Sequence, residues 1–162
     1  MLNNNEPGVI ELQKLRRDVN ALMQRERMIY GTGTWVPSWS GSSTAGAFTY
    51  TTQVGVYTQV ERLIFVSAHL LISAIGTPPV GNLRIAGLPF ACEATYDHSL
   101  AIGLLSNIDL TTADVQLTAR VAAGSTLIAL LESFDNLAAT FYPAANFTNV
   151  NAEFELSGWY RM

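Results

Sequence analysis

The fold is decided by residues 31–90, which read GTGTWVPSWSGSSTAGAFTYTTQVGVYTQVERLIFVSAHLLISAIGTPPVGNLRIAGLPF. Segments rich in Val, Ile, Thr, Phe and Tyr alternate there with Gly, Ser, Pro and Asn, which is the pattern of short strands and turns in an all-β domain. Residues 63–72 and 126–131 carry apolar side chains at both odd and even positions. We expect both segments to be buried on both faces, with sister subunits covering the second face. Residues 153–162 alternate apolar and polar side chains, which predicts a half-buried last strand among about eight.

A heptad pattern precedes this β-rich region. Within residues 9–30, apolar side chains recur at alternating steps of three and four, at Leu12, Leu15, Val19, Leu22 and Ile29. The spacing predicts the seam of a parallel coiled-coil stem, interrupted at Glu26. Leu and Val share one seam position, so the pattern does not choose between two and three strands, and an amphipathic helix lying on its own domain is the alternative. Residues 1–8 are polar and contain Pro7 and Gly8, which fits either an anchoring peptide or a disordered end.

The amino-acid composition limits the classes of molecule that the protein could bind. Of the 162 residues, 49% are hydrophobic and only 14% are charged, which favours an oligomer that hides part of its surface. The net charge of −4 and the scattered Lys and Arg argue against nucleic acid. Cys92 is the single cysteine, so no intrachain disulfide can form. Neither a signal peptide nor a membrane-spanning segment is recognisable, so we expect synthesis in a cytoplasm and no membrane insertion.

Several segments together resemble a known group of proteins. GTWVPSW, TAGAFTYTTQVGVYTQV and GNLRIAGLPF, with the terminal FELSGWYRM, resemble the small trimeric jelly-roll knobs of tailed-bacteriophage fibre and capsid-decoration proteins. Residues 91–150 match these knobs only in the general spacing of strand-like and turn-like segments. The resemblance implies a mainly β fold: a trimeric antiparallel β-sandwich of the jelly-roll type, similar in plan to tumour-necrosis-factor and complement heads. It divides the chain into an anchoring peptide (1–8), a coiled-coil stem (9–30) and a knob (31–162).

The resemblance also implies that the protein is located on the virion surface. The favoured interpretation is a non-enzymatic homotrimer that binds other capsid or tail proteins through its N-terminus, as a capsid-decorating or head-fibre protein. A chain this short fits that role better than a whole tail fibre. The alternative is the receptor-binding tip of a tail fibre or spike, which adheres to a bacterial surface saccharide. A hydrolase, motivated only by Glu132, Asp135, Glu153 and Glu155, is the least favoured hypothesis.

The chemistry-bearing residues do not form a recognisable motif. His69 and His98 are the only histidines, and Cys92, Glu93 and Asp97 lie near the second, but the spacing lacks the paired ligands of a zinc site. Common catalytic signatures are absent, so we expect no enzymatic activity, metal or cofactor.

Aromatic and loop residues supply the candidate contacts. Among the aromatics suited to sugar stacking, we expect Trp35 and Trp39 to be core or interface residues and Trp159 mostly core. The aperiodic stretch 132–150 predicts an exposed loop that could touch a glycan or a protein. Its candidate contact residues are Asp135, Asn136 and Tyr142.

Overall fold

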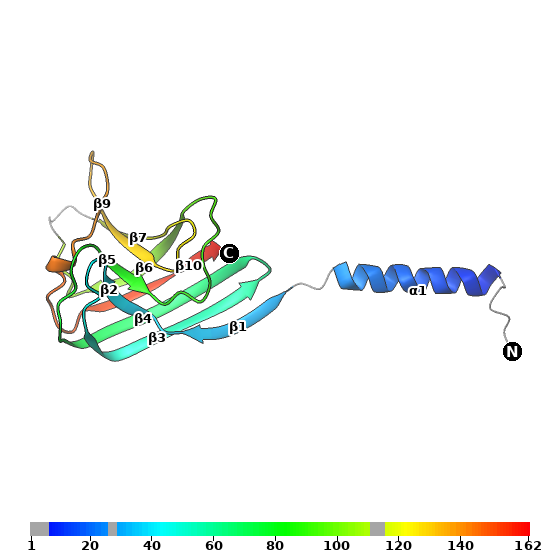
Figure 1. Cartoon of the computed structure of the whole chain (residues 1–162), viewed down its shortest axis with the longest axis horizontal. Coiled ribbons are helices and arrows are strands. Elements are labelled where there is room, and N and C mark those ends of the chain that lie inside the picture. Colours follow the sequence, from blue (N-terminus) through cyan, green and yellow to red (C-terminus); the bar gives the residue numbers. More distant parts are fainter. Residues whose placement is uncertain (1–6, 26–28, 111–115) are drawn as a thin grey trace.

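The computed structural model describes residues 7–25, 29–110 and 116–162, and within these ranges it contains one α-helix and ten strands. The helix projects from one end of a β-domain that holds all the strands (Figure 1). In chain order the elements are α1 (Pro7–Arg25), β1 (Tyr30–Trp35), β2 (Ser38–Gly41), β3 (Phe48–Val60), β4 (Leu63–Ile75), β5 (Leu83–Ala86), β6 (His98–Ser106), β7 (Gln116–Val121), β8 (Ile128–Ser133), β9 (Thr140–Phe141), the 3₁₀ turn η1 (Ala144–Asn146) and β10 (Glu153–Arg161).

The helix occupies most of the predicted stem but has different ends. It begins at Pro7, inside the predicted anchoring peptide, because proline's missing N–H costs nothing in a first helical turn. It ends at Arg25, so the expectation that Ile29 belongs to the seam is wrong. The Ile29 N–H instead donates to Glu61 Oε1 at 2.9 Å, and the Glu61 N–H donates to the Ile29 carbonyl at 2.8 Å. These two bonds tie Ile29 to the β3–β4 turn. Residues 1–6 and Glu26 lie outside the described residues.

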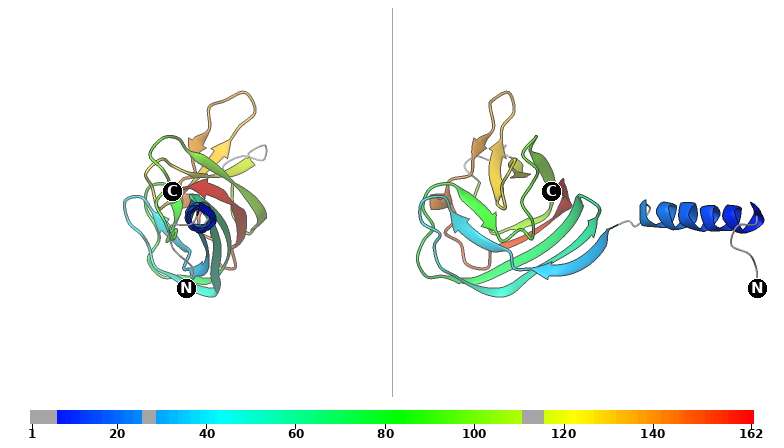
Figure 2. Two further views of the ribbon diagram at one scale, coloured as in Figure 1. Left: turned by 90° about the vertical axis from the view of Figure 1, so that its right-hand side faces the viewer. Right: turned by 45° about the vertical axis from the view of Figure 1, so that its right-hand side comes forward.

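All strand pairs are antiparallel, and they follow one continuous path, β1-β3-β4-β10-β6-β7-β8-β5-β2, with β9 paired to β8. The two strands at the ends of this path, β1 and β2, are consecutive in the chain and are separated only by Val36 and Pro37. So short a connection brings the two ends of the path close together, and the sheet must therefore curl. Figures 1 and 2 show the resulting half-barrel, in which the long β3–β4 hairpin forms the outer wall.

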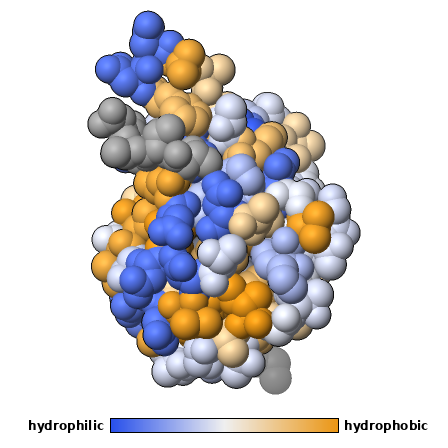
Figure 3. Space-filling view, turned by 90° about the vertical axis from the view of Figure 1, so that its left-hand side faces the viewer, coloured by the Kyte–Doolittle hydropathy of each residue, from blue (hydrophilic) through white to orange (hydrophobic). Residues whose placement is uncertain are grey.

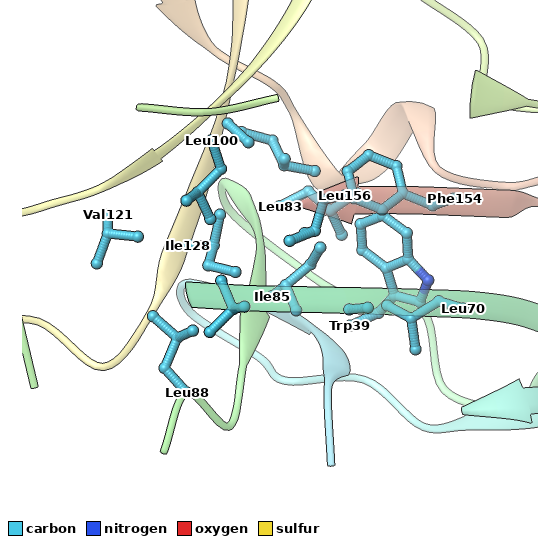
Figure 4. Close-up of a cluster of buried hydrophobic side chains, with 14 of the residues drawn as sticks. Trp39, Leu70, Leu83, Ile85, Leu88, Leu100, Val121, Ile128, Phe154 and Leu156 are labelled. Atoms are coloured by element: carbon cyan, nitrogen blue, oxygen red, sulfur yellow. The ribbon is translucent and has the colours of Figure 1, made fainter. Parts of the chain in front are cut away.

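The concave side of the curled sheet holds the core. Alternate residues of β4 and β10 point into it, so Leu70, Phe154 and Leu156 are buried while their neighbours along the strands are not. Trp39 of β2 packs edge-on to Phe154 with ring centroids 5.2 Å apart. Figure 4 shows Trp39 and Phe154 together with side chains from β5, β6, β7 and β8, so the core joins both halves of the strand path. Trp35 and Trp39, which were expected to be core or interface residues, both lie in this core.

The two segments expected to be buried on both faces behave differently. In β4 only the inward residues are buried, and Phe65 on the other face is 44% exposed. In β8, Leu130, Leu131 and Glu132 are consecutive and all buried, so this chain itself covers both faces there. Pairing with β9, where Leu131 lies opposite Phe141, supplies part of that cover. Sister subunits are therefore not needed to bury β8.

Candidate ligand-binding site

A pocket of about 430 Å³ lies beside the β3–β4 turn, close to the start of β1. Its walls are made of Glu61, Arg62, Leu63, Tyr96, Trp159 and Arg161. Three separate parts of the chain meet here: the β3–β4 turn, the loop before β6, and the end of β10. The pocket combines two aromatic rings with two guanidinium groups, a mixture typical of binding sites rather than of plain surface.

The alternation of β10 places two of the wall residues. Tyr160 points into the core and is fully buried, so Trp159 and Arg161 on either side of it face outward. The β4–β10 register sets Trp159 opposite Phe65 and Arg161 opposite Leu63. Arg62 follows Glu61, whose backbone has a positive φ of 54° in the tight turn.

A buried carboxylate lies beneath the two arginines. The Glu93 side chain is 8% exposed, and its Oε2 is 3.7 Å from both Arg62 Nη2 and Arg161 Nε. Its Oε1 is 3.6 Å from His98 Nε2. Neither Glu93 Oε1 nor His98 Nε2 has a hydrogen-bond partner among the described residues. All three distances exceed a hydrogen bond, so Glu93 holds the arginines by charge without using up their N–H groups.

The aromatic wall is fixed from below by His98. The His98 ring centroid lies 4.6 Å from that of Tyr96 and 5.2 Å from that of Trp159. His98 itself is buried, whereas Tyr96 and Trp159 are 48% and 47% exposed. The expectation that Trp159 is mostly core is therefore wrong: its ring is held in place on one side and open to solvent on the other.

Cys92, next to Glu93, is not an activated nucleophile. Its side chain is buried, and burial raises the pKa of the thiol, with Glu93 and Asp97 adding to the shift through their negative charge. A raised pKa keeps the sulfur protonated, whereas a nucleophilic cysteine needs the thiolate. Asp97 is engaged elsewhere, in an ion pair with Arg120 at 3.2 Å and a hydrogen bond from the Ala123 N–H at 2.8 Å.

The three candidate contact residues of the loop do not lie together. Asp135 and Asn136 are exposed in the turn between β8 and β9, where Asn136 has a positive φ of 61°. This turn protrudes above the end of the domain remote from the helix, a face on which hydrophilic and hydrophobic residues are interspersed (Figure 3). Tyr142 is fully buried, and its hydroxyl donates to the Asp109 carbonyl at 2.6 Å. Tyr142 therefore cannot present its ring to a ligand, and its expected role is corrected to that of a core residue.

The seam residues of α1 are uncovered. Leu12, Leu15 and Val19 are all exposed, Leu12 by 67%, and Ile10 beside them is exposed as well. Two hollows along the helix, of about 390 and 440 Å³, are walled by helix residues alone. Leu22 lies on α1, but its side chain is outside the described part of the structure.

Other polar groups lie on the convex face of the sheet. His69 Nε2 is 2.9 Å from Glu153 Oε1, and His69 Nδ1 is 3.8 Å from Glu155 Oε1.

Within residues 7–25, 29–110 and 116–162 there is no cluster of three or more His, Cys, Asp or Glu arranged to hold a metal ion. In the same ranges, no helix has the length and apolarity required to cross a membrane.

Sequence reasoning missed most of this pocket for identifiable reasons. The alternation that placed Glu153 and Glu155 outward also places Trp159 and Arg161 outward, so the signal for these two was present. Tyr96 and Glu93 lie in an irregular loop, where no period indicates which side chain turns inward. Their proximity to Arg62 is a consequence of the tertiary fold.

The chain shares its fold with part of a tailspike protein. The crystal structure of the Dettilon tailspike protein (gp208) matches with a TM-score of 0.68 and 21% sequence identity, over 82% of this chain and 24% of that chain. The chain thus spans about a quarter of the length of that protein. No protein-family model matches the sequence, and no curated protein matches it.

Proposed function

We propose that the protein is a non-enzymatic appendage of a tailed-phage virion, a homotrimer with a helical stem and a β-domain knob. The single observation that carries the proposal is the stem: α1 projects from the knob with its apolar seam at Leu12, Leu15 and Val19 open to solvent. A lone helix of 19 residues is marginally stable in water, so this helix needs neighbouring chains. The fold shared with part of a tailspike protein supports the same class of appendage.

The number of copies and the type of knob rest on the resemblance to phage fibre and decoration knobs. We propose three parallel stems and a knob of the jelly-roll type. The stems meet at the axis and each continues toward β1, so β1 and its neighbour β3 lie nearest to the axis. The outward residues Thr34, Val54 and Val56 of these strands are exposed and uncharged, which suits a contact between knobs.

The proposal of no enzymatic activity is supported by the placement of the candidate groups. The Cys92 thiol is buried and protonated, and Glu132 is 1% exposed on β8. Glu153 and Glu155 flank His69 on the convex sheet face. Loss of viscosity of a capsular polysaccharide solution incubated with the purified protein would contradict this part of the proposal.

The end of α1 that is remote from the knob is the natural attachment end. We propose that residues 1–7 bind a capsid or tail protein of the particle. A chain that starts at Gly8 keeps the seam, so it should still assemble with itself but fail to join particles. Incorporation of the shortened chain at the level of the full chain would contradict the anchoring role.

Immunogold electron microscopy of the phage particles tests the virion role, with antibodies raised against residues 29–162. Label on every particle is the expected result, and particles without label would contradict the proposal. The position of the label also separates two finer roles. Label on the head supports a capsid-decorating or head-fibre protein, whereas label at the tail supports a fibre or spike tip.

A second candidate function is adhesion to a saccharide on the bacterial surface. The observation that favours it is the pocket at Arg62, Tyr96, Trp159 and Arg161. Trp159 lies on β10, three strands along the sheet from β1, a distance of roughly 14 Å at the usual spacing between strands. A contact between knobs that is centred on Thr34, Val54 and Val56 therefore leaves the Trp159 side of this pocket open.

A further inference from the structure

We infer that the pocket at the end of β10 is a subsite for an acidic sugar, a pyranose that carries a carboxylate. This inference rests on the adhesive role proposed above and names its ligand class. The ring would pack on Trp159 and Tyr96, and the carboxylate would be held between Arg62 and Arg161.

The aromatic part of the pocket is suited to a sugar ring. A pyranose has a face of C–H groups, which pack on the electron-rich face of an indole or phenol ring. Trp159 and Tyr96 are each about half exposed, 47% and 48%, although their rings are anchored by His98 between them. Because His98 is buried and holds both rings, little side-chain freedom is lost when a ligand binds.

The arginines supply unused donors. Arg62 Nε donates to the Met162 carbonyl at 2.8 Å, which fixes the direction of that side chain. Among the described residues, no hydrogen bond occupies the guanidinium of Arg161, whose only contact of this kind is the 3.7 Å approach to Glu93. The two guanidiniums share one buried carboxylate, and Arg groups bind carboxylates through paired N–H donors. A carboxylate that enters from solvent therefore meets guanidinium N–H groups that Glu93 orients but does not hydrogen-bond.

Glu61 limits the choice of ligand. Glu61 is one of the wall residues, and its Oε1 accepts the Ile29 N–H at 2.9 Å, which fixes the direction of its side chain. It weakens the attraction for an anion without blocking the guanidinium donors. Glu61→Gln keeps an oxygen for the Ile29 N–H and removes the charge. This variant should strengthen binding of an acidic sugar by roughly two- to fivefold and leave a neutral sugar unaffected.

The test uses the full chain and two probes, methyl β-glucuronide and methyl β-glucoside, which differ only at C6, a carboxylate in the first and a hydroxymethyl group in the second. Saturation-transfer NMR titrations measure the binding of each. We expect the glucuronide to bind roughly tenfold more tightly than the glucoside. Arg161→Gln should reduce that difference severalfold, since Arg62 alone then holds the carboxylate, and Trp159→Ala should weaken both sugars. Phe65→Ala, the cross-strand neighbour of Trp159 outside the pocket, is the matched control and should change neither.

The outcomes decide the inference separately from the proposed virion role. Equal binding of the two sugars would overturn the acidic specificity, and binding of neither sugar would overturn the subsite. A glucuronide preference that is undiminished in Arg161→Gln would also overturn the assignment. The Arg161 side chain is 44% exposed, and in this variant the buried Glu93 keeps Arg62 as a cationic neighbour. A protein that decorates particles but binds no sugar would leave the appendage role standing.

Discussion

Replacing Tyr160 with phenylalanine should make the protein less stable at neutral pH but more stable at high pH. Tyr160 is fully buried on β10, and its hydroxyl donates to the Phe90 carbonyl at 2.9 Å. Burial raises the pKa of the Tyr160 hydroxyl from 10.0 to about 12, although the hydrogen bond that the Phe90 N–H donates to this hydroxyl, at 3.4 Å, lowers the pKa in part. The folded protein therefore holds this proton more tightly than the unfolded chain does.

The sign and size of the effect follow from proton linkage. A group whose pKa is raised on folding contributes its full stability below the unfolded pKa, here near pH 10, and loses it as the pH rises toward the folded pKa, near 12. At pH 12 the wild-type protein should have lost about 2 kcal/mol from Tyr160 alone. The phenylalanine variant has no proton to lose, but it lacks a hydrogen bond that contributes about 1 kcal/mol. The two curves should therefore cross between about pH 10.5 and 11.

Urea denaturation at fixed protein concentration, from pH 7 to 12, measures this crossing, since an oligomer's stability depends on concentration. The buried Tyr142 also has a raised pKa, because of burial and then the charges of Glu132 and Asp109, so both proteins should weaken at high pH. Only the difference in the free energy of unfolding between wild type and Tyr160→Phe reports on Tyr160 alone. Tyr30→Phe, at a residue that is 69% exposed, is the control and should leave the shape of the curve unchanged. Parallel curves for wild type and Tyr160→Phe would refute the reasoning.

The remaining predictions concern packing. Gly55→Ala should lower the free energy of unfolding by about 2–4 kcal/mol in urea denaturation, because the added Cβ would lie 2.6 Å from Trp35 Nε1 and must push out the buried indole. Gly31→Ala, whose Cβ meets nothing closer than 3.7 Å, is the control, and equal losses in the two variants would contradict the argument. Phe154→Ala should cost about 3–5 kcal/mol through the cavity left beside Trp39. Phe65→Ala on the convex face, where Phe65 is 44% exposed, should cost below about 1 kcal/mol, and thermal unfolding of both variants at low concentration checks the contrast.

Much of the fold could be predicted from the sequence because it depends on the local periodicity of apolar residues. The heptad pattern of Leu12, Leu15 and Val19 predicted a helix, and the alternation of residues 153–162 predicted a half-buried strand, although Trp159 was expected in the core. The curl of the sheet was not predictable in this way. It depends on the pairing of β10 between β4 and β6, residues far apart in the chain, and on a short link between the two edge strands.

The site was less predictable than the fold. Tyr142 lies in an aperiodic stretch that suggested an exposed loop, yet it is buried and its hydroxyl donates to the carbonyl of Asp109, 33 residues earlier, a contact that no local pattern encodes. Glu93 and Arg62 meet only because β10 and the β3–β4 turn end at the same place. Ile29 lies outside the helical seam, and its N–H donates to the side chain of Glu61, 32 residues later. In each case a long-range contact outweighed the local signal.

Sedimentation equilibrium of the full chain tests the central claim most directly. The account predicts a particle of three times the chain mass of 17.6 kDa. Leu12→Ser with Leu15→Ser should shift it toward the monomer, whereas Lys14→Ser on the same helix should not. A full chain that sediments as a monomer at micromolar concentration would contradict the account.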